Sequence, residues 1–218
     1  MKFTISPNSL WASYRPTEVG LRRMRALLPD DLQLAKVKLL RDDDAEYKLL
    51  FNVYHVNSLP WLLGTRIDIQ TCVRSRTTGL PHLLLLDVFS DTLLWDPTRG
   101  VCLPNLRSMR TRQRKGRFRT HLRNSRDRFF VDASLSASKD PDYDFIVSSN
   151  RVCFFANSSV PVPATFDEEV VMQPVRLLES ATVQNTLWSK ERVRRHDHLF
   201  IHEHPMEFDL HPPLWYAA

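Results

Sequence analysis

Cysteine is scarce in this sequence, and its scarcity excludes two common ways of stabilising a protein. Only Cys72, Cys102 and Cys153 occur among 218 residues, and no two of them form a C-x-x-C pair. An odd number of widely spaced cysteines argues against a disulfide framework and against a zinc site built from thiolates. We therefore expect three reduced thiols in a reducing compartment, and we predict a cytoplasmic location.

Glycine and long apolar runs are also lacking. The chain has five glycines, and none belongs to a P-loop, a dinucleotide-binding fingerprint or a G-x-S-x-G elbow. The longest apolar stretch, around residues 83–86, is far shorter than the roughly 20 residues that cross a bilayer. The first residues contain no apolar segment of the kind found in signal peptides. Phosphate-cradling loops, the common nucleophile motifs and a membrane location are therefore not expected.

The sequence does contain the pattern of a β-rich domain with one helix. Hydrophobic residues make up 43% of the chain, enough for a substantial core. A helix is expected to begin at Pro16-Thr17-Glu18 and to end before Pro29, and a hairpin is expected to turn at Thr77-Thr78-Gly79. Alternating sequence patterns predict strands over 32–37, 49–56, 67–73, 117–123, 129–135, 151–156, 170–178, 181–188, 198–201 and 206–210. The nearly continuous apolar run over 80–89 predicts a strand that is covered on both faces. We predict a single β-rich α+β domain over residues 1–218.

The order of these elements resembles that of a known family. A helix ends in Leu27-Leu28-Pro29-Asp30-Asp31-Leu32, a strand covers 51–56, and a hairpin turns at Thr78-Gly79. An apolar strand ending in Leu86-Asp87 is followed by Gly100-Val101-Cys102-Leu103-Pro104-Asn105. On these residues the chain resembles the acetoacetate decarboxylase-like superfamily over 17–110 and, more loosely, 170–210. The resemblance implies a double β-barrel or cone with a short N-terminal helix and an enclosed small-molecule pocket.

The resemblance also shows what this chain has lost. In the decarboxylases the second lysine of a Pro-Lys-Lys segment forms a Schiff base with the keto acid, whereas the matching segment here reads Pro104-Asn105-Leu106. An amide and an alkyl side chain cannot form an imine, so Schiff-base decarboxylation is not expected at this position. The family carries one glutamate on each of two neighbouring strands, which align near Asn52 and near Arg66 or Asp68. The resemblance therefore implies a similar pocket with different chemistry, and we expect neither a cofactor nor a metal.

The candidate site is built from these positions and their neighbours. Arg66 is a candidate to bind a planar carboxylate or enolate through two parallel hydrogen bonds, and Asp68 is a candidate general acid or base. The candidates to bind and orient the substrate are Asn52, Tyr54, Trp95 and Asn105. The predicted function is an isomerase, dehydratase, cyclase or lyase that acts on a small carbonyl or carboxylate compound. The alternative is that Arg66 and Asp68 form a structural ion pair on an exposed strand face.

Four histidines lie at even-numbered positions near the end of the chain. They are His196, His198, His202 and His204. On one unbroken strand they would share a face, and neutral imidazoles bind transition metals. Along such a strand, however, residues 198 and 202 would lie about 13 Å apart, so at most one pair could reach a single ion. We favour polar surface residues that flank the apolar segment 199–201 over a metal site.

The segment 107–128 is the strongest compositional anomaly. It contains ten Arg or Lys against one acid, Asp127, and phenylalanines lie within or beside it. The simpler interpretation is the exposed face of a hairpin with residues 115–116 at its tip, where charge also resists strand-to-strand aggregation. Arginines and aromatics also bind phosphate chains or acidic partners, although no nucleic-acid motif accompanies them and nucleic acid is not the favoured partner. A non-catalytic binder that uses this surface is the alternative function, and a homo-oligomer is compatible with either function.

Overall fold

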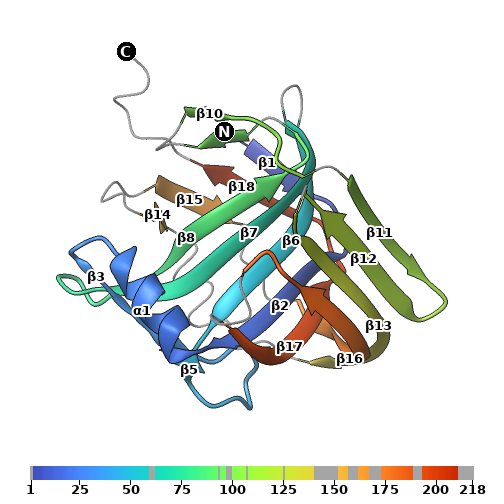
Figure 1. Ribbon diagram of the computed structural model, residues 1–218, viewed down its shortest axis with the longest axis horizontal. Coiled ribbons are helices and arrows are strands. Elements are labelled where there is room, and N and C mark those ends of the chain that lie inside the picture. The colour runs from blue at the N-terminus through green and yellow to red at the C-terminus, as the bar shows by residue number, and fades with distance from the viewer. Residues whose placement is uncertain are drawn as a thin grey trace.

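A computed structural model describes residues 2–58, 62–92, 94–96, 100–106, 108–124, 126–139, 152–156, 162–166, 173–188 and 193–210. Within these ranges the chain forms one helix, α1 (Glu18–Ala26), and many strands (Figure 1). The strands are β1 (Lys2–Ile5), β2 (Ser9–Pro16), β3 (Leu32–Leu34), β4 (Lys36–Val37), β5 (Glu46–Tyr47), β6 (Leu49–Ser58), β7 (Leu62–Ser75), β8 (Pro81–Ser90), β9 (Leu94–Asp96), β10 (Gly100–Cys102), β11 (Ser108–Arg114), β12 (Arg117–Arg123), β13 (Arg128–Lys139), β14 (Val152–Phe155), β15 (Val162–Phe166), β16 (Val175–Asn185), β17 (Val193–His202) and β18 (Met206–Leu210). The prediction of a β-rich chain with a short N-terminal helix is confirmed.

The helix forms where its sequence signals place it. The side-chain oxygen of Thr17 accepts a hydrogen bond from the N–H of Gly20 at 3.1 Å, which satisfies one of the unpaired amides of the first turn. An acidic residue in the first turn and arginines in the last turn complement the helix dipole. Leu21 and Met24 are buried against the sheet. No helix in the described part of the chain is long and apolar enough to cross a membrane.

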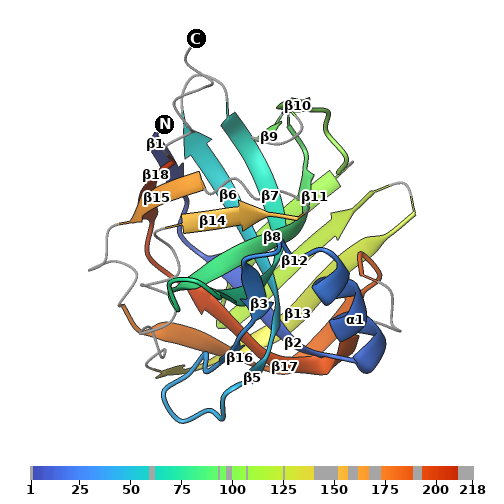
Figure 2. The same ribbon diagram turned by 90° about the vertical axis from the view of Figure 1, so that its left-hand side faces the viewer.

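Most strands belong to one large sheet. Its order is β11-β12-β13-β16-β17-β2-β6-β1-β18-β15-β14-β8-β7-β3, and β6 also pairs with β7. The pairings from β6 through β1, β18, β15, β14, β8 and β7 therefore lead back to β6. Figures 1 and 2 show β6, β7 and β8 between the other four strands of this cycle, β1, β14, β15 and β18, and the group formed by β11, β12 and β13.

β6 and β7 contribute to two cores, one on each of their faces. The first core comprises Leu10, Ala12, Tyr14, Met24, Leu32, Leu49, Phe51, Val53, Ile67, Ile69, Val73, Leu84, Leu86, Leu106, Phe118, Leu122, Phe129, Val131, Ala133, Leu178, Trp188, Leu199 and Ile201. The second core comprises Ile5, Ala35, Val37, Leu39, Leu50, Tyr54, Val56, Cys72, Leu83 and Met206. Odd-numbered residues of β6 face the first core and even-numbered residues face the second, because successive side chains of a strand point to opposite faces. β8 is likewise buried on both faces, as its continuous apolar sequence predicts.

Both predicted hairpins are present. The turn at residues 76–79 joins β7 to β8, and Gly79 has a φ of 71°. β11 and β12 are joined by Lys115 and Gly116, whose φ values are 49° and 72°. Two consecutive residues with positive φ are typical of the tight turns that match the twist of paired strands.

One pair of predicted strands is a single strand in the structure. The sequence pattern predicts strands over 170–178 and 181–188, whereas the described residues 173–188 contain β16 alone. Between its pairings with Ser134 and Asp132, β16 holds one extra residue, and Ser180 has a φ of 50°. A bulge adds a residue without ending the strand, so it interrupts the alternation that the prediction relied on.

Candidate active site

The register of β6 and β7 places four of the predicted site residues side by side. Asn52 lies opposite Asp68, and Tyr54 lies opposite Arg66. All four have even numbers, and they therefore project from the face that carries the second core. Two neighbouring strands thus gather a carboxylate, a guanidinium, a phenol and an amide on one face.

Asp68 is the centre of this group. Arg66 Nε donates a hydrogen bond to Asp68 Oδ1 at 2.5 Å, and the Tyr54 hydroxyl donates to Asp68 Oδ2 at 2.7 Å. Tyr54 is 5% exposed and Asp68 is 8% exposed. The ion pair between Arg66 and Asp68 therefore exists, but it lies on a buried face rather than on the exposed face of the alternative interpretation. An ion pair with little water around it is stronger than one at the surface.

Asn52 adds a polar atom that lacks a partner among the described residues. The side chain is 7% exposed, and its Oδ1 accepts no hydrogen bond from any residue that the structure describes. A buried acceptor without a donor costs about 1–3 kcal/mol, so its place beside Asp68 calls for an explanation. A ligand that donates a hydrogen bond to Oδ1 would remove this cost.

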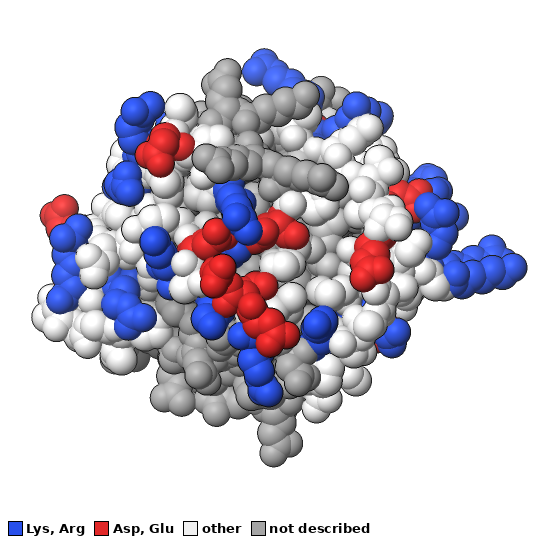
Figure 3. Space-filling view, turned by 90° about the horizontal axis from the view of Figure 1, so that it is seen from below, with Lys and Arg blue, Asp and Glu red and all other residues white. Residues whose placement is uncertain are grey.

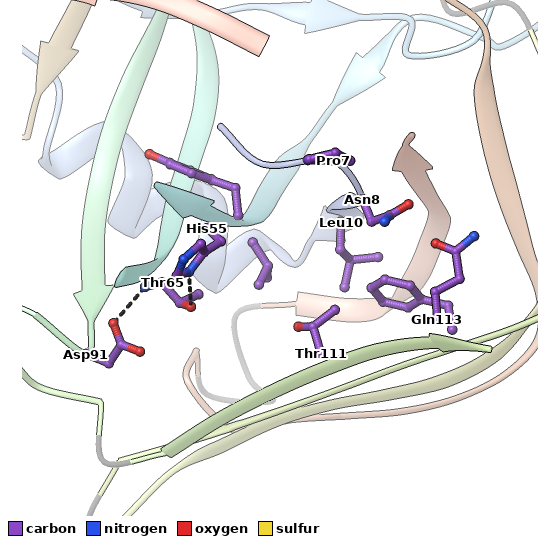
Figure 4. Close-up of a pocket in the computed structure, with 11 residues that line it drawn as sticks. Pro7, Asn8, Leu10, His55, Thr65, Asp91, Thr111 and Gln113 are labelled. Atoms are coloured by element: carbon purple, nitrogen blue, oxygen red, sulfur yellow. Dashed lines mark hydrogen bonds between the residues drawn. The ribbon is translucent and has the colours of Figure 1, made fainter. Parts of the chain in front are cut away.

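A cavity of about 440 Å³ adjoins β6, mainly on the face that carries the first core (Figure 4). Leu10, Val53 and Phe118 of the first core form its apolar wall. The remaining lining residues are Pro7, Asn8, Tyr54, His55, Thr65, Asp91, Thr111 and Gln113. Thr65 joins two of the polar ones, since its hydroxyl lies 3.3 Å from His55 Nδ1 and its backbone N–H donates to Asp91 Oδ1 at 2.6 Å. Neither Arg66 nor Asp68 lines this cavity.

Comparison with known proteins finds a match for the structure of this chain but none for its sequence. The sequence matches no family model and no curated protein. The structure matches the crystal structure of acetoacetate decarboxylase from Legionella pneumophila with a TM-score of 0.55, over 95% of this chain and 84% of that chain. The chain has the fold of acetoacetate decarboxylase. The resemblance predicted from the order of helix and strands is thereby confirmed, and at 13% sequence identity it extends to the fold alone.

The structure shows how Leu106 lies relative to the Asp68 group. This residue stands where the resemblance places the Schiff-base lysine, and it is 5% exposed within the first core. Arg66 and Asp68 project toward the second core. Leu106 and the Asp68 group therefore lie on opposite faces of the sheet.

Asn105 and Trp95 do not join the Asp68 group among the described side chains. The Asn105 amide donates to the carbonyl of Val88 at 3.0 Å and accepts from the N–H of Ser90 at 2.7 Å. Val88 pairs with Asp68, so β8 separates Asn105 from the group. Asn105 thus fastens the chain to the end of β8, while the side chain of Trp95 lies outside the described residues.

A buried charge network that the sequence pattern did not predict lies at the start of β6. Lys48 is 1% exposed, and its ammonium donates to Glu46 at 3.2 Å and to Asp197. Arg15 donates to the same Asp197 carboxylate at 3.1 Å. Figure 3 views the molecule from the side on which Figure 1 places β5, and acidic and basic side chains gather there. A lysine between apolar residues was the only local signal, because its main partner is 149 residues away.

The network also sets the ionisation of Asp197. Burial alone would raise the pKa of this carboxyl, but the hydrogen bond and the charge of Lys48 lower it below its ordinary value. His198 and Arg15 lower the pKa further. Asp197 is therefore held as a carboxylate, and Lys48 has a permanent counter-ion.

Irregularities in β17 interrupt the alternation that would place the four histidines on one face. Its pairing with β2 shifts register twice between residues 193 and 199, which breaks the alternation of an ideal strand. His198 Nε2 lies 3.0 Å from Asp43 Oδ1, whereas His202 Nδ1 bonds to the carbonyl of His204. In the described ranges, no three His, Cys, Asp or Glu side chains are placed to hold a metal ion.

Proposed function

We propose that this chain is an enzyme that acts on a small carbonyl or carboxylate compound by acid–base chemistry, without a Schiff base. The observation that carries the proposal is the buried Asp68 carboxylate, bonded by Arg66 and Tyr54 and facing the unpartnered Oδ1 of Asn52. A carboxylate positioned by a fixed cation and a hydroxyl is suited to proton transfer. The cycle of pairings from β6 through β18 and β8 back to β6 supports a barrel with this group on its inner face.

The proposed step is removal of a proton from the carbon next to a carbonyl. Asp68 takes the proton, the C–H electron pair forms a carbon–carbon double bond, and the carbonyl oxygen becomes an enolate. The Arg66 guanidinium stabilises the enolate charge, because a fixed cation is most effective where water is excluded. Return of the proton to another carbon gives isomerisation, and departure of a group from the next carbon gives elimination.

Tyr54 and Asn52 have supporting roles in this proposal. The Tyr54 hydroxyl holds Asp68 Oδ2 and so orients the carboxylate, and each carboxylate oxygen has a second lone pair for the substrate proton. Asn52 Oδ1 accepts a hydrogen bond from a substrate hydroxyl, which would satisfy the buried acceptor. Tyr54 thus positions the carboxylate and Asn52 positions the substrate, and neither takes part in the bond that breaks.

Two features support chemistry without an imine. Leu106 fills the position of the Schiff-base lysine with an alkyl side chain in the first core. Lys48, the buried lysine near the start of β6, donates to two carboxylates. Imine-forming lysines instead lie in apolar pockets or beside another cation. Neither residue therefore replaces the lost nucleophile.

Hydrogen–deuterium exchange of candidate substrates tests the proposal directly. The protein is incubated in D2O with small 2-keto, 3-keto and 2-hydroxy acids, and proton NMR follows loss of the signal next to the carbonyl. We expect exchange above the buffer rate for at least one compound, and a loss of roughly 100-fold or more in Asp68→Asn, since that is the usual contribution of a general base. Arg66→Ala should lower the rate similarly, with an unchanged circular dichroism spectrum.

The matched controls are Arg74→Ala and His55→Ala. Arg74 is an exposed arginine on the same strand as Arg66, and His55 lines the cavity of Figure 4. Both variants should retain the exchange rate. An unchanged rate in Asp68→Asn would refute the proposed base, and loss of exchange in His55→Ala would move the site to the cavity. A covalent adduct trapped with borohydride and a keto acid would refute chemistry without a Schiff base.

A further inference from the structure

The outer face of β11, β12 and β13 carries arginines in register. Arg112 lies opposite Arg119, and Arg114 lies opposite Arg117. Arg123 lies opposite Arg128 in the next pair of strands. All six side chains are exposed, and by the alternation of the strands they share one face with Arg110. In Figure 1 the β11–β12 hairpin extends at the right of the molecule, and basic side chains project at the same edge of Figure 3.

This arrangement is costly for an isolated sheet. Like charges directly opposite each other on paired strands destabilise the sheet. Asp132 is the one acid on this face of β11–β13 within the described residues, and it already bonds to Arg117 at 2.8 Å and to Arg119. The arginines of β11 have no such acid among their neighbours on β12. A bound polyanion would remove the repulsion that the sheet itself leaves uncompensated.

An aromatic pair lies among these charges. His121 lies opposite both Arg110 and Phe130, so the three side chains form one row across the three strands. The rings of His121 and Phe130 are 6.0 Å apart at an interplanar angle of 78°, and both are partly exposed. Successive rows on one face of a sheet are about 7 Å apart, so arginines lie on either side of the ring pair within reach of one flexible chain.

We infer that this face binds single-stranded nucleic acid, independently of the proposed enzymatic function. Arginines on either side of the ring pair contact consecutive phosphates, and Phe130 with His121 offers a surface on which a base stacks. Positive charge combined with exposed aromatic rings is the usual composition of surfaces that bind single strands. In a duplex the base faces are stacked inside, so they cannot stack on the ring pair. An acidic protein would be bound by the arginines without use of the ring pair. Both therefore fit this face less well than a single strand does.

Fluorescence anisotropy with a labelled 12-nucleotide single strand of mixed sequence tests the inference. Arg110, Arg112 and Arg114 are replaced together by Gln, and the matched control replaces Arg22, Arg23 and Arg25, exposed on α1, by Gln. Both triple variants lose the same charge. We expect the slope of log affinity against log salt to fall by about 2 in the β11 variant, at about 0.7 per lost phosphate contact. The α1 variant should keep the wild-type slope.

The variant Phe130→Leu distinguishes binding of nucleic acid from binding of other polyanions. This variant keeps every charge, and it should weaken binding of the oligonucleotide roughly tenfold through lost stacking. It should leave binding of heparin and of poly-glutamate unchanged. Equal weakening in the α1 variant, or no binding at 20 mM salt, would overturn the inference. Equal affinity of Phe130→Leu and wild type for the oligonucleotide, with tight binding of poly-glutamate, would assign the face to an acidic protein instead.

Discussion

Lys48 is a buried charge whose partners only the tertiary structure assembles. At the residue scale, its 1% exposure would be unfavourable for an unpaired ammonium, but Glu46 and Asp197 lie within ion-pair distance. The Asp197 side chain is 12% exposed, so it too is largely removed from water. Removing one partner of a buried pair is more damaging than removing both, because the remaining charge stays buried without compensation.

Lys48→Met should therefore lower the free energy of unfolding by about 3 kcal/mol, the lower end of values for breaking a buried pair. Urea denaturation followed by circular dichroism measures this change. Arg15→Met is the matched control, because Arg15 bonds to the same carboxylate but is 51% exposed, and its loss should lower the free energy of unfolding much less. If the free energy of unfolding falls equally in the two variants, burial of Lys48 does not strengthen its contribution to stability.

His82 predicts a pH dependence of stability. Burial lowers the pKa of this imidazole below its ordinary 6.5, and the Asp31 carboxylate raises it only in part. The folded state therefore binds fewer protons than the unfolded state, and His82's contribution is fully present above pH 6.5 and is lost as pH falls through the folded pKa. Between pH 7 and pH 5, the free energy of unfolding measured by urea denaturation should decrease less in His82→Gln than in wild type. In the control His204→Gln, which replaces an exposed histidine, this free energy should decrease by as much as in wild type.

At the scale of the element, the sequence predicted the features that depend only on neighbouring residues, namely helix caps and tight turns. The cap at Thr17 and the turn at residues 115–116 depend on neighbouring residues only, and both are where the sequence places them. The bulges in β16 and β17 depend on how each strand meets its partner. Their neighbours in the sequence do not reveal them, which is why the two strands predicted around residue 180 proved to be one.

The turn residue Lys115 should be replaceable with a gain in stability. Its φ of 49° is unfavourable for most side chains, whereas asparagine tolerates this conformation. Lys115→Asn should raise the free energy of unfolding by about 0.5–1 kcal/mol in urea denaturation. Lys115→Gln removes the same charge without the conformational gain and should change stability less. A larger gain in the glutamine variant would attribute the effect to charge.

At the scale of the whole molecule, β6 and β7 join the two cores. Phe51 and Tyr54 lie on the same strand, yet they belong to the first and the second core respectively. A strand cannot leave one core without disrupting the other. We therefore predict that residues 1–218 unfold as one cooperative unit, in keeping with a single domain.

Phe51→Ala tests this coupling. The side chain is fully buried, and its truncation should cost about 3–5 kcal/mol. Circular dichroism and tryptophan fluorescence should report the same shifted urea midpoint, because both cores are lost together. Two separate transitions in the variant would show that the halves on either side of β6 are independent domains.

The candidate site was predictable only as far as strand alternation reaches. Strand alternation places Asn52 and Tyr54 on one face of β6, and it places Arg66 and Asp68 on one face of β7. The register of the two strands then puts all four side chains on the same face of the sheet. Asn105 was placed with them by resemblance, and the structure instead puts β8 between Asn105 and Asp68. The relation of a loop to a sheet depends on the path of the whole chain, which alternation does not describe.

The sequence by itself determined the β-rich class, the capped helix and the two hairpin turns. Each depends on residue chemistry or on the periods of helix and strand, which are properties of a few neighbouring residues. Only the tertiary structure decided that Arg66 and Asp68 face a buried side, that Leu106 lies on the opposite one, and that Lys48 meets Asp197. These relations join residues that are distant along the chain, and they arise from how the cores pack on the two faces of β6 and β7.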